Sequence, residues 1–240
     1  RSRGSLGLIE RCAASGVRNF VFSSSAAVYG EPQYLPIDEN HPTVPINYYG
    51  FTKKSVEENL SWFSRLRGMR FAALRYFNAA GYDRSGRIRG IERRTQNLLP
   101  LVMEVAAGIR PQISVFGTDY DTRDGTCIRD FIHVTDLAEA HILAANRLAA
   151  GSGNLQLNLG SGNRNTVLEV LQAVERATGR PVPVTMSPRR PGDAIALYAD
   201  TTKVSRELGW TPKLSDIDTV VSTAWAFHRR VWNIDAQAAE

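Results

Sequence analysis

The stretch FVFSSSAAVYG, residues 20–30, joins a short apolar run to a series of small and hydroxyl side chains. Its first three residues have the composition of a buried β-strand. In an open α/β sheet, ligands bind at the carboxyl ends of the strands. The serines at positions 23–25 follow the apolar run, so the stretch predicts a strand whose last residues lie at a ligand site.

Strands and helices alternate along the rest of the chain. This alternation is typical of an α/β protein with a parallel sheet and helices on both faces. Strands are predicted at residues 20–22, 69–78, 113–117, 128–134, 154–162 and 181–186. Helices are predicted at residues 6–15, 47–67, 97–108, 166–178, 200–208 and 215–231, with another that has Thr135 as its N-cap.

The composition is that of an ordinary globular protein. Hydrophobic residues make up 43% and charged residues 22% of the 240 residues, and the net charge of +5 suits anionic ligands without indicating nucleic acid. No apolar run approaches the ~20 residues of a membrane span. The two cysteines stand far apart in sequence. They form neither a disulfide framework nor a metal-binding pattern, and they are compatible with a cytoplasmic location.

Residues 84–94 contain five arginines in eleven residues, and a nucleic-acid interpretation would rest on this segment alone. No aromatic side chains alternate with these arginines, and no recognised nucleic-acid-binding motif surrounds them. We therefore interpret the segment as a solvated loop and expect no nucleic-acid partner.

The segment NYYGFTKKSVEEN, residues 47–59, places Tyr49 and Lys53 four residues apart in a predicted helix. Side chains at this spacing are neighbours on one helix face. An ammonium beside a phenol favours the phenolate, and such a tyrosine can take a proton from a hydroxyl and return it. Alone, this spacing more often marks an ordinary surface pair. The upstream strand adds a serine that could reach the same hydroxyl.

The order of serine, tyrosine and lysine on a strand and the next helix resembles the short-chain dehydrogenase/reductase superfamily. Its extended branch has the same Tyr-Gly and proline-rich loop before the helix. Over nearly the whole chain, further segments resemble the UDP-glucose 4-epimerase family, in that family's order. These segments are LRYFNAAG (74–81), NLLPLVMEVAAG (97–108), VFGTDYDTRDGTCIRDFIHVTDLAEAH (115–141), NLGSGNRNTVLEV (158–170) and PRRPGD (188–193).

The resemblance implies an isomerase that uses NAD to interconvert UDP-glucose and UDP-galactose. It also implies a partial Rossmann-like, doubly wound parallel sheet with a smaller α/β substrate domain. Tyr49 would be the catalytic acid and base, Lys53 would stabilise its phenolate and bind the cofactor ribose, and Ser25 would bind the 4-hydroxyl of the sugar. A hydride would pass from C4 to NAD⁺, and the 4-keto sugar would turn over and take it back on its other face.

The same resemblance assigns the remaining site residues. Phe77 would join Ser25, Tyr49 and Lys53 in contacting the cofactor. The substrate contacts would be Asn78 and Asn97 to the sugar or diphosphate, Val115 and Phe116 to the uridine, Arg129 and Arg190 to the diphosphate, and Asp193 to a ribose. A guanidinium fork matches phosphate oxygens, which suits the two arginines. No metal site is expected.

The chain departs from the family pattern at its beginning. The strand, Gly-x-x-Gly-x-x-Gly turn and helix that seat the pyrophosphate do not occur in the sequence, so we expect this chain alone to bind NAD poorly and to be weakly active or inactive. The expected domains are the C-terminal part of an NAD-binding Rossmann domain at 1–80, rejoined by roughly 125–160, and a nucleotide-sugar-binding domain at 81–124 and 161–240. The full-length protein is expected to be a homodimer that uses the helices at residues 6–15 and 47–67.

Three other functions compete with this interpretation. A truncated, non-catalytic remnant would keep the nucleotide-sugar cleft without the cofactor site. A 4-epimerase of another UDP-sugar, an N-acetylhexosamine or a pentose, stays open, because Leu197 stands where the family often has a tyrosine or a small residue beside the sugar's 2-substituent. A nucleotide-sugar dehydratase is disfavoured, because Ala26 and Ala27 stand where dehydratases carry an acid pair.

Overall fold

The computed structural model describes residues 2–88, 90 and 96–234. The chain forms two compact units, each built from three segments. Unit 1 consists of Arg1–Phe77, Leu137–Gly162 and Leu197–Thr211. Unit 2 consists of Asn78–Asp136, Asn163–Ala196 and Pro212–Glu240.

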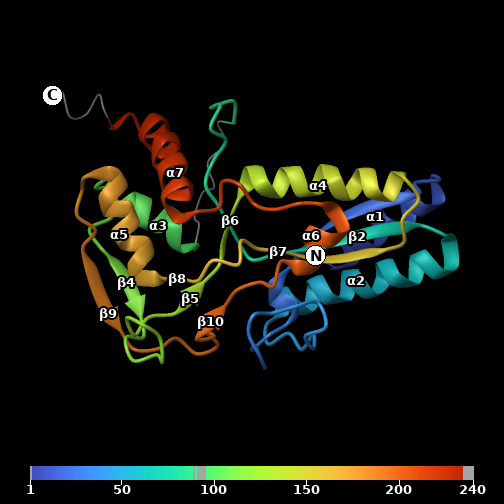
Figure 1. The fold of residues 1–240 in the computed structure, drawn as a ribbon, viewed down its shortest axis with the longest axis horizontal. Helices are drawn as coiled ribbons and strands as arrows, with labels where there is room; N and C mark the ends of the chain where they lie inside the picture. The colour runs from blue at the N-terminus through green and yellow to red at the C-terminus, as the bar shows by residue number, and fades with distance from the viewer. Residues whose placement is uncertain (1, 89, 91–95, 235–240) are drawn as a thin grey trace. The chain divides into compact units, whose positions relative to one another are not determined.

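Unit 1 is built on a three-stranded parallel sheet (Figure 1). Its strands are β1 (Asn19–Ser25), β2 (Arg70–Tyr76) and β7 (Leu155–Leu159), in the order β1-β2-β7. Ser25 pairs with Tyr76, and Tyr76 pairs with Leu159. The three strands therefore end at a common carboxyl edge, where an α/β protein binds its ligands.

Helices cover both faces of this sheet. α1 (Ser2–Ala14) and α2 (Tyr48–Arg67) lie on one face, where Ile9 and Leu60 pack with Phe71 of β2. Most of α4 (Val134–Ala149) belongs to unit 1, and it lies on the opposite side of the sheet from α2 (Figure 1). Two shorter helices complete the unit, η1 (Ala26–Val28) directly after β1 and α6 (Thr202–Leu208).

Local sequence determines both ends of α2. The side chain of Asn47 accepts a hydrogen bond from the Gly50 N–H at 2.8 Å, which caps the first turn. Gly68 takes a left-handed φ of 66°, and its N–H donates to the Ser64 carbonyl and ends the helix. The helix predicted at 47–67 is thus confirmed, with Tyr49 in its first turn.

Unit 2 combines short strand pairs with helices. β3 (Asn78–Ala80) pairs in parallel with β6 (Phe131–His133), and β4 (Ile113–Phe116) pairs in parallel with β9 (Val184–Ser187). A further sheet has the order β10 (Ala196–Leu197), β5 (Ile128–Arg129), β8 (Asn165–Thr166), although Leu197 itself belongs to unit 1. The helices are α3 (Leu98–Ala106), α5 (Val167–Thr178) and α7 (Ile217–Val231).

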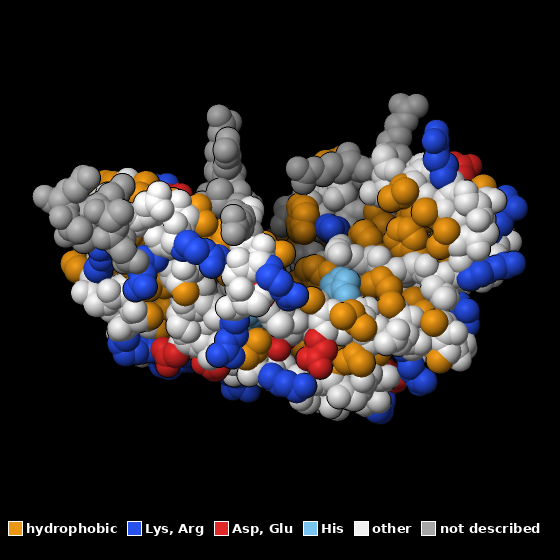
Figure 2. All heavy atoms as spheres, turned by 90° about the horizontal axis from the view of Figure 1, so that it is seen from above, with side chains coloured by type: hydrophobic (Ala, Val, Ile, Leu, Met, Phe, Trp, Pro, Cys, Tyr) orange, Lys and Arg blue, Asp and Glu red, His pale blue; other side chains and the backbone are white. Residues whose placement is uncertain are grey.

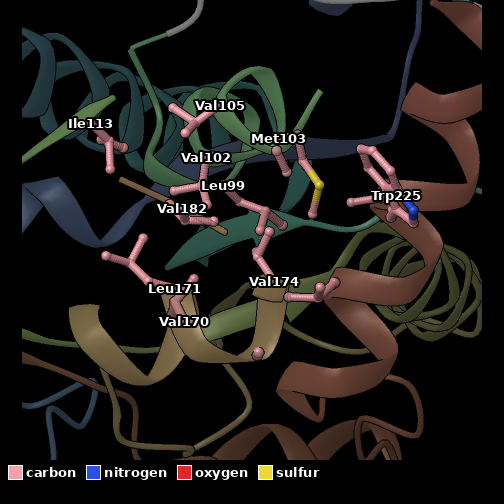
Figure 3. Close-up of a cluster of buried hydrophobic side chains, with 14 of the residues drawn as sticks. Leu99, Val102, Met103, Val105, Ile113, Val170, Leu171, Val174, Val182 and Trp225 are labelled. Carbon is pink, nitrogen blue, oxygen red and sulfur yellow. The ribbon is translucent and has the colours of Figure 1, made fainter. Parts of the chain in front are cut away.

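Apolar side chains of α3, α5 and α7 form the core of unit 2 (Figure 3). The labelled members include Leu99, Val102 and Met103 from α3, Val170, Leu171 and Val174 from α5, and Trp225 from α7. β4 joins this core through alternate side chains: Ile113 and Val115 are buried, whereas Phe116 is exposed. The core therefore holds the strand that presents Phe116 to the outside.

The structure corrects two local predictions and confirms a third. The strand predicted at 128–134 is divided into β5 and β6, because between them the Asp130 carbonyl accepts the backbone and side-chain N–H groups of Asn78. α4 begins at Val134, so Thr135 is not its N-cap; the Thr135 N–H donates instead to His133 Nδ1 at 3.0 Å. The helix predicted at 166–178 is confirmed as α5, and Thr166 and Glu169 form a capping box at its start.

The predicted α/β fold with a parallel sheet and helices is confirmed. Residues 125–136, which we expected with the first domain, lie in unit 2, and Leu197–Thr211, expected with the second, lies in unit 1. Backbone hydrogen bonds of Ile37 with Tyr198 and Asp200 attach this latter segment to unit 1. The domain boundaries of the complete protein stay a prediction. No helix in the described residues combines the length and the apolar composition that a membrane span requires.

Candidate active site

The serines at the carboxyl end of β1 are engaged in three different ways. Ser23 offers its backbone carbonyl, which accepts a hydrogen bond from Lys53 Nζ at 2.7 Å. Ser24 is buried, and its hydroxyl donates to Glu57. Ser25 ends the strand, and its hydroxyl accepts a hydrogen bond from the Ala27 N–H at 3.2 Å. Ser25 therefore lies between β1 and η1, at the carboxyl edge of the sheet, where α/β proteins bind ligands.

α2 presents Tyr49 and Lys53 on one face, as their spacing predicts. Lys53 Nζ lies 5.5 Å from the ring centroid of Tyr49 and 5.1 Å from that of Phe22 on β1. Its hydrogen bond to Ser23 holds the ammonium in this place. Tyr49 is 48% exposed, so a ligand can reach it. The structure thus places a cation that can stabilise a phenolate beside an accessible phenol, next to the end of β1.

Gly50 allows the first turn of α2 to approach η1 closely. A Cβ built on Gly50 would lie 2.2 Å from the carbonyl oxygen of Ala27 and 3.0 Å from Cβ of Pro45. No side chain fits in this space unless α2 or η1 moves. The absence of a side chain at this position therefore sets the spacing between Tyr49 and the segment that begins at Ser25.

We expect Gly50→Ala to lower both the stability and the turnover of the complete protein. Alanine is the better helix former by about 0.5–1 kcal/mol, but overpacking of this kind costs about 1–3 kcal/mol. A shifted helix also moves Tyr49 away from Ser25, and kcat falls if these two residues have the catalytic roles that the family resemblance implies. Urea unfolding and steady-state kinetics measure the two effects. Gly7→Ala on α1, where an added Cβ meets nothing within 4 Å, is the control. The expectation fails if the two variants behave alike.

A second phenol, Tyr76 at the end of β2, lies close to this pair. Its hydroxyl is hydrogen-bonded with Ser23 Oγ at 2.8 Å and with His141 Nε2 on α4. His141 Nδ1 donates to the Leu137 carbonyl at 2.7 Å, which leaves Nε2 as the acceptor of the neutral ring. Burial raises the pKa of Tyr76, its bond with Ser23 opposes this, and a charge on Tyr49 raises it further. Tyr76 is therefore held in its neutral form.

Phe77 follows β2 directly and is partly buried. It packs with Leu197 against a small cluster formed by Val28, Tyr29 and Ile37. Val28 belongs to η1, so both Phe77 and Leu197 lie beside the segment that follows Ser25. Contact of Phe77 with a nicotinamide, and of Leu197 with the sugar's 2-substituent, stay predictions that this placement supports.

Unit 2 gathers four of the residues predicted to bind the nucleotide. Arg190 pairs with Asp193 at 2.9 Å, and Asp193 also faces Arg129 at 3.6 Å. The Arg190 guanidinium lies 5.0 Å from the ring centroid of Phe116. Arg129 is fixed by donating to two backbone carbonyls, each at 2.8 Å. Two guanidinium groups, a carboxylate and an aromatic ring are suited to the diphosphate, ribose and base of a nucleotide.

The other three predicted substrate residues also lie in unit 2. The side-chain amide of Asn78 donates to the Asp130 carbonyl at 2.8 Å, so part of this side chain is engaged within the protein. Asn97 is the residue before α3, and its side chain makes no capping hydrogen bond there. Val115 is 1% exposed and belongs to the core, so a ligand could contact only its backbone.

Within residues 2–88, 90 and 96–234, no group of three or more His, Cys, Asp or Glu side chains could hold a metal ion.

On the face drawn in Figure 2, Lys and Arg side chains are dispersed among apolar and uncharged ones. Positions 89 and 91–95 of the arginine-rich segment lie outside the described residues. The expected absence of a nucleic-acid partner therefore stays a prediction.

Sequence reasoning placed Ser23 and Ser24 at the predicted site but gave them no role of their own. It missed the other residues that hydrogen-bond with this part of the site, which are Glu57, Arg75, Tyr76 and His141. One signal was present, since a charged residue inside an apolar strand, as at Arg75, is almost never buried unless it is paired. Glu57 stands four residues after Lys53 and therefore on the same helix face.

Comparisons with known proteins place this site in context. The family model described as GDP-mannose 4,6 dehydratase matches residues 2–223. The UDP-glucose 4-epimerase of Halalkalibacterium halodurans is 43% identical over 92% of this chain and 66% of its own length. That of Rhizobium leguminosarum bv. trifolii is 45% identical over 95% of this chain and 69% of its own. The chain thus spans about two thirds of the length of these curated relatives.

Solved structures show the same likeness. The UDP-glucose 4-epimerase from Brucella ovis, in complex with NAD, superposes with a TM-score of 0.91 at 45% identity, over 94% of this chain and 70% of its own. The enzyme from Bifidobacterium longum, in complex with NAD⁺ and UDP, gives 0.86 at 39% identity, over 95% and 69%. A UDP-Glc/GlcNAc 4-epimerase from Campylobacter jejuni gives 0.81 at 37% identity, over 95% and 70%.

Proposed function

We propose, because this chain belongs to the UDP-glucose 4-epimerase family, that the complete protein is an isomerase that interconverts UDP-glucose and UDP-galactose with NAD as its cofactor. The observation that carries this proposal is the placement of Lys53 beside the accessible phenol of Tyr49, at the carboxyl end of β1. This arrangement can move a hydroxyl proton, which the oxidation and reduction of an alcohol require.

The residues of unit 1 fit the nicotinamide riboside end of NAD. Lys53 supplies an ammonium group for the ribose hydroxyls, Ser25 lies at the same carboxyl edge of the sheet, and Phe77 supplies an aromatic surface next to η1. When bound, NAD supplies the acceptor and donor of the hydride. Ser25, Tyr49, Lys53 and Phe77 are therefore the residues that we assign to the cofactor in this chain.

In this proposal Tyr49 carries the proton. As a phenolate it takes the proton of the sugar's 4-hydroxyl when C4 is oxidised, and it returns that proton when C4 is reduced. Lys53 stabilises the phenolate, while Ser25 hydrogen-bonds the 4-oxygen and orients it. The same group takes and returns the proton, so one turnover leaves the enzyme in its starting state.

We assign the UDP part of the substrate to unit 2. Asp193 now pairs with Arg190 and Arg129, and a diphosphate could replace its carboxylate as the partner of both arginines. Asp193 would then be released to bind a ribose hydroxyl, and Phe116 would contact the uracil. Asn78, Asn97 and the backbone of Val115 complete the proposed substrate contacts.

A dehydratase is the rival activity within the family, since the matching family model carries that description. Elimination of water needs an acid and a base next to the serine, and Ala26 and Ala27 of η1 can transfer no proton. This supports epimerisation. A second rival is an epimerase for another UDP-sugar, because the partly buried Leu197 leaves the size of the 2-substituent undecided.

The proposal is tested by supplying the purified complete protein with NAD and UDP-galactose and following the formation of UDP-glucose. UDP-N-acetylgalactosamine and a UDP-pentose are assayed in parallel to decide the sugar. A 4-keto-6-deoxy product would indicate a dehydratase. Tight binding of UDP without turnover would indicate a non-catalytic remnant, and either result would overturn the proposal.

The proposed homodimer rests on a stripe of exposed apolar side chains on α2. Phe51, Trp62 and Leu66 are 55%, 58% and 72% exposed and lie on one helical face, away from the sheet. We expect Trp62→Glu to convert the complete protein to monomers in analytical ultracentrifugation, because it places a charge in an apolar contact. Ile142→Glu on α4, 62% exposed, is the matched control and should stay dimeric. A parent protein that sediments as a monomer contradicts the dimer.

The cytoplasmic location of the protein also stays a proposal, and cell fractionation would test it.

A further inference from the structure

A buried ion pair lies beneath the proposed active site. Arg75 of β2 and Glu57 of α2 make two contacts, Nη2 to Oε2 at 2.6 Å and Nε to Oε1 at 3.1 Å. Each side chain is only 5% exposed. Removing two charges from water is costly, and buried ion pairs are weak sources of stability. Their value more often lies in the geometry that their directed bonds impose.

Arg75 keeps its charge inside the protein. Burial alone would lower the pKa of this guanidinium, but its contacts with Glu57 and Tyr29 raise the pKa above the ordinary value. Tyr29, which accepts from Arg75 Nη1 at 2.9 Å, is itself neutral, because burial raises its pKa to about 12. Glu57, and not Tyr29, is therefore the ion-pair partner of Arg75 in this network.

Glu57 also links α2 to all three strands of the sheet. Besides its bonds to Arg75 on β2, it accepts a hydrogen bond from the buried hydroxyl of Ser24 on β1. It accepts another from Gln156 Nε2 on β7 at 3.2 Å. One carboxylate therefore fixes the height and rotation of α2 over the strands that end at the site.

The position of Glu57 in α2 connects this network to the proposed chemistry. Tyr49, Lys53 and Glu57 follow one another at intervals of four residues and so line one side of the helix. On β1, three consecutive serines correspond to these three residues of α2. The Ser23 carbonyl binds Lys53, the Ser24 hydroxyl binds Glu57, and Ser25 is left for the substrate. Rotation of α2 about its axis would disturb all three relations together.

We propose that the Glu57–Arg75 pair, with Ser24, is a positioning device that sets the distance and angle between the Tyr49–Lys53 pair and Ser25. This inference rests on the proposed function of Tyr49 as the proton carrier. It assigns the second serine of the stretch at 23–25 to the alignment of α2, a role separate from substrate binding. Glu57 and Arg75 touch neither substrate nor cofactor in this arrangement.

The test compares Glu57→Gln with Glu58→Gln in the complete protein. Glu58 is the next residue, and its exposed carboxylate lies 3.8 Å from Lys54. We expect Glu57→Gln to lower kcat roughly 10- to 100-fold, with a much smaller change in KM, because a displaced catalytic group slows the chemical step. Glu58→Gln should leave kcat and KM unchanged.

The pH profile separates positioning from simple loss of folded enzyme. Among the described residues, Lys53 on α2 contacts the Tyr49 ring, and Tyr76 on β2 interacts with Tyr49 electrostatically. If Glu57 holds Lys53 near Tyr49, Glu57→Gln moves the rise of kcat with pH to higher pH, because the phenolate is less favoured. An absorbance titration without nucleotide, corrected with Tyr49→Phe, should show the same displacement. Loss of folded protein would instead scale kcat equally at every pH.

In Glu57→Gln the buried charge of Arg75 has no charged partner, which could cause a folding defect. The double variant Glu57→Gln/Arg75→Met controls for this defect, because it leaves no unpaired buried charge. We expect its Tm to exceed that of Glu57→Gln, while both titration curves stay displaced. Curves that coincide with those of the parent, in the single or the double variant, overturn the inference. Activity retained by Tyr49→Phe would instead overturn the proposed function, so the two failures are distinguishable.

Discussion

Replacement of Tyr49 by phenylalanine is expected to lower kcat of the complete protein by about 10²–10⁴-fold, the range for loss of a general acid–base group. Phenylalanine keeps the ring and its packing but cannot carry the proton of the 4-hydroxyl. The ring lies 5.5 Å from Lys53 Nζ, and that contact is retained in the variant. Binding of UDP should be unchanged, because the residues assigned to the diphosphate lie in unit 2.

The neighbouring tyrosine provides the matched control. Tyr48 is 73% exposed and points about 100° away from Tyr49 around the helix, since an α-helix has 3.6 residues per turn. Tyr48→Phe should therefore retain the kcat of the parent. Steady-state conversion of UDP-galactose, with UDP affinity from calorimetry, measures both variants. If Tyr49→Phe retains parental kcat, Tyr49 is not the proton carrier.

The sequence was sufficient where local chemistry determines the structure. The apolar run before Ser23 predicted β1, and Gly68 and Gly179 ended their helices in left-handed conformations, as glycines after helical patterns do. The spacing of Tyr49 and Lys53 placed them on one face of α2. Each of these features depends on residues that are close in sequence, so periodicity and capping rules were enough.

The sequence was insufficient where distant segments meet. Nothing near Glu57 indicates that it pairs with Arg75, because the pairing depends on how α2 crosses the sheet. The strand predicted at 128–134 was divided because Asp130 bonds with Asn78, more than fifty residues away. Even for Val115 and Phe116, which are adjacent, the sequence did not show which side chain enters the core. Such features depend on how helices and strands that are distant in sequence pack together, which no local pattern encodes.

The largest pH effect on folding is expected from a histidine that lies outside the proposed site. His228 of α7 is 2% exposed and stacks on Trp232, with 4.3 Å between ring centroids. In the described part of the chain, neither of its ring nitrogens has a hydrogen-bond partner. Burial lowers the pKa of His228 from 6.5 to about 4. A charged imidazole in this apolar contact would have no partner to offset its loss of water.

The sign of the effect follows from proton binding. Between pH 6.5 and about 4 the unfolded chain binds a proton at His228 and the folded chain does not, so the free energy of unfolding falls as pH falls. The contribution is fully present above pH 6.5 and is lost as pH approaches about 4. At about 1.36 kcal/mol per pKa unit, this shift corresponds to roughly 3 kcal/mol. That is a large share of the ~5–15 kcal/mol that stabilises a typical domain.

Substitution of His228 by phenylalanine should remove most of this pH dependence, because the ring can still stack but cannot bind a proton. Urea unfolding at intervals across the acidic range gives the free energy for the parent and the variant. His133, whose pKa is also lowered by burial, remains in both proteins and accounts for a residual slope. His228→Leu repeats the test without an aromatic ring, in case phenylalanine packs poorly. If the parent and both variants lose stability equally between pH 6.5 and 4, His228 does not stay neutral in the folded protein. In that case its nitrogens must have access to water, which would place an opening in the packing between α7 and Tyr82.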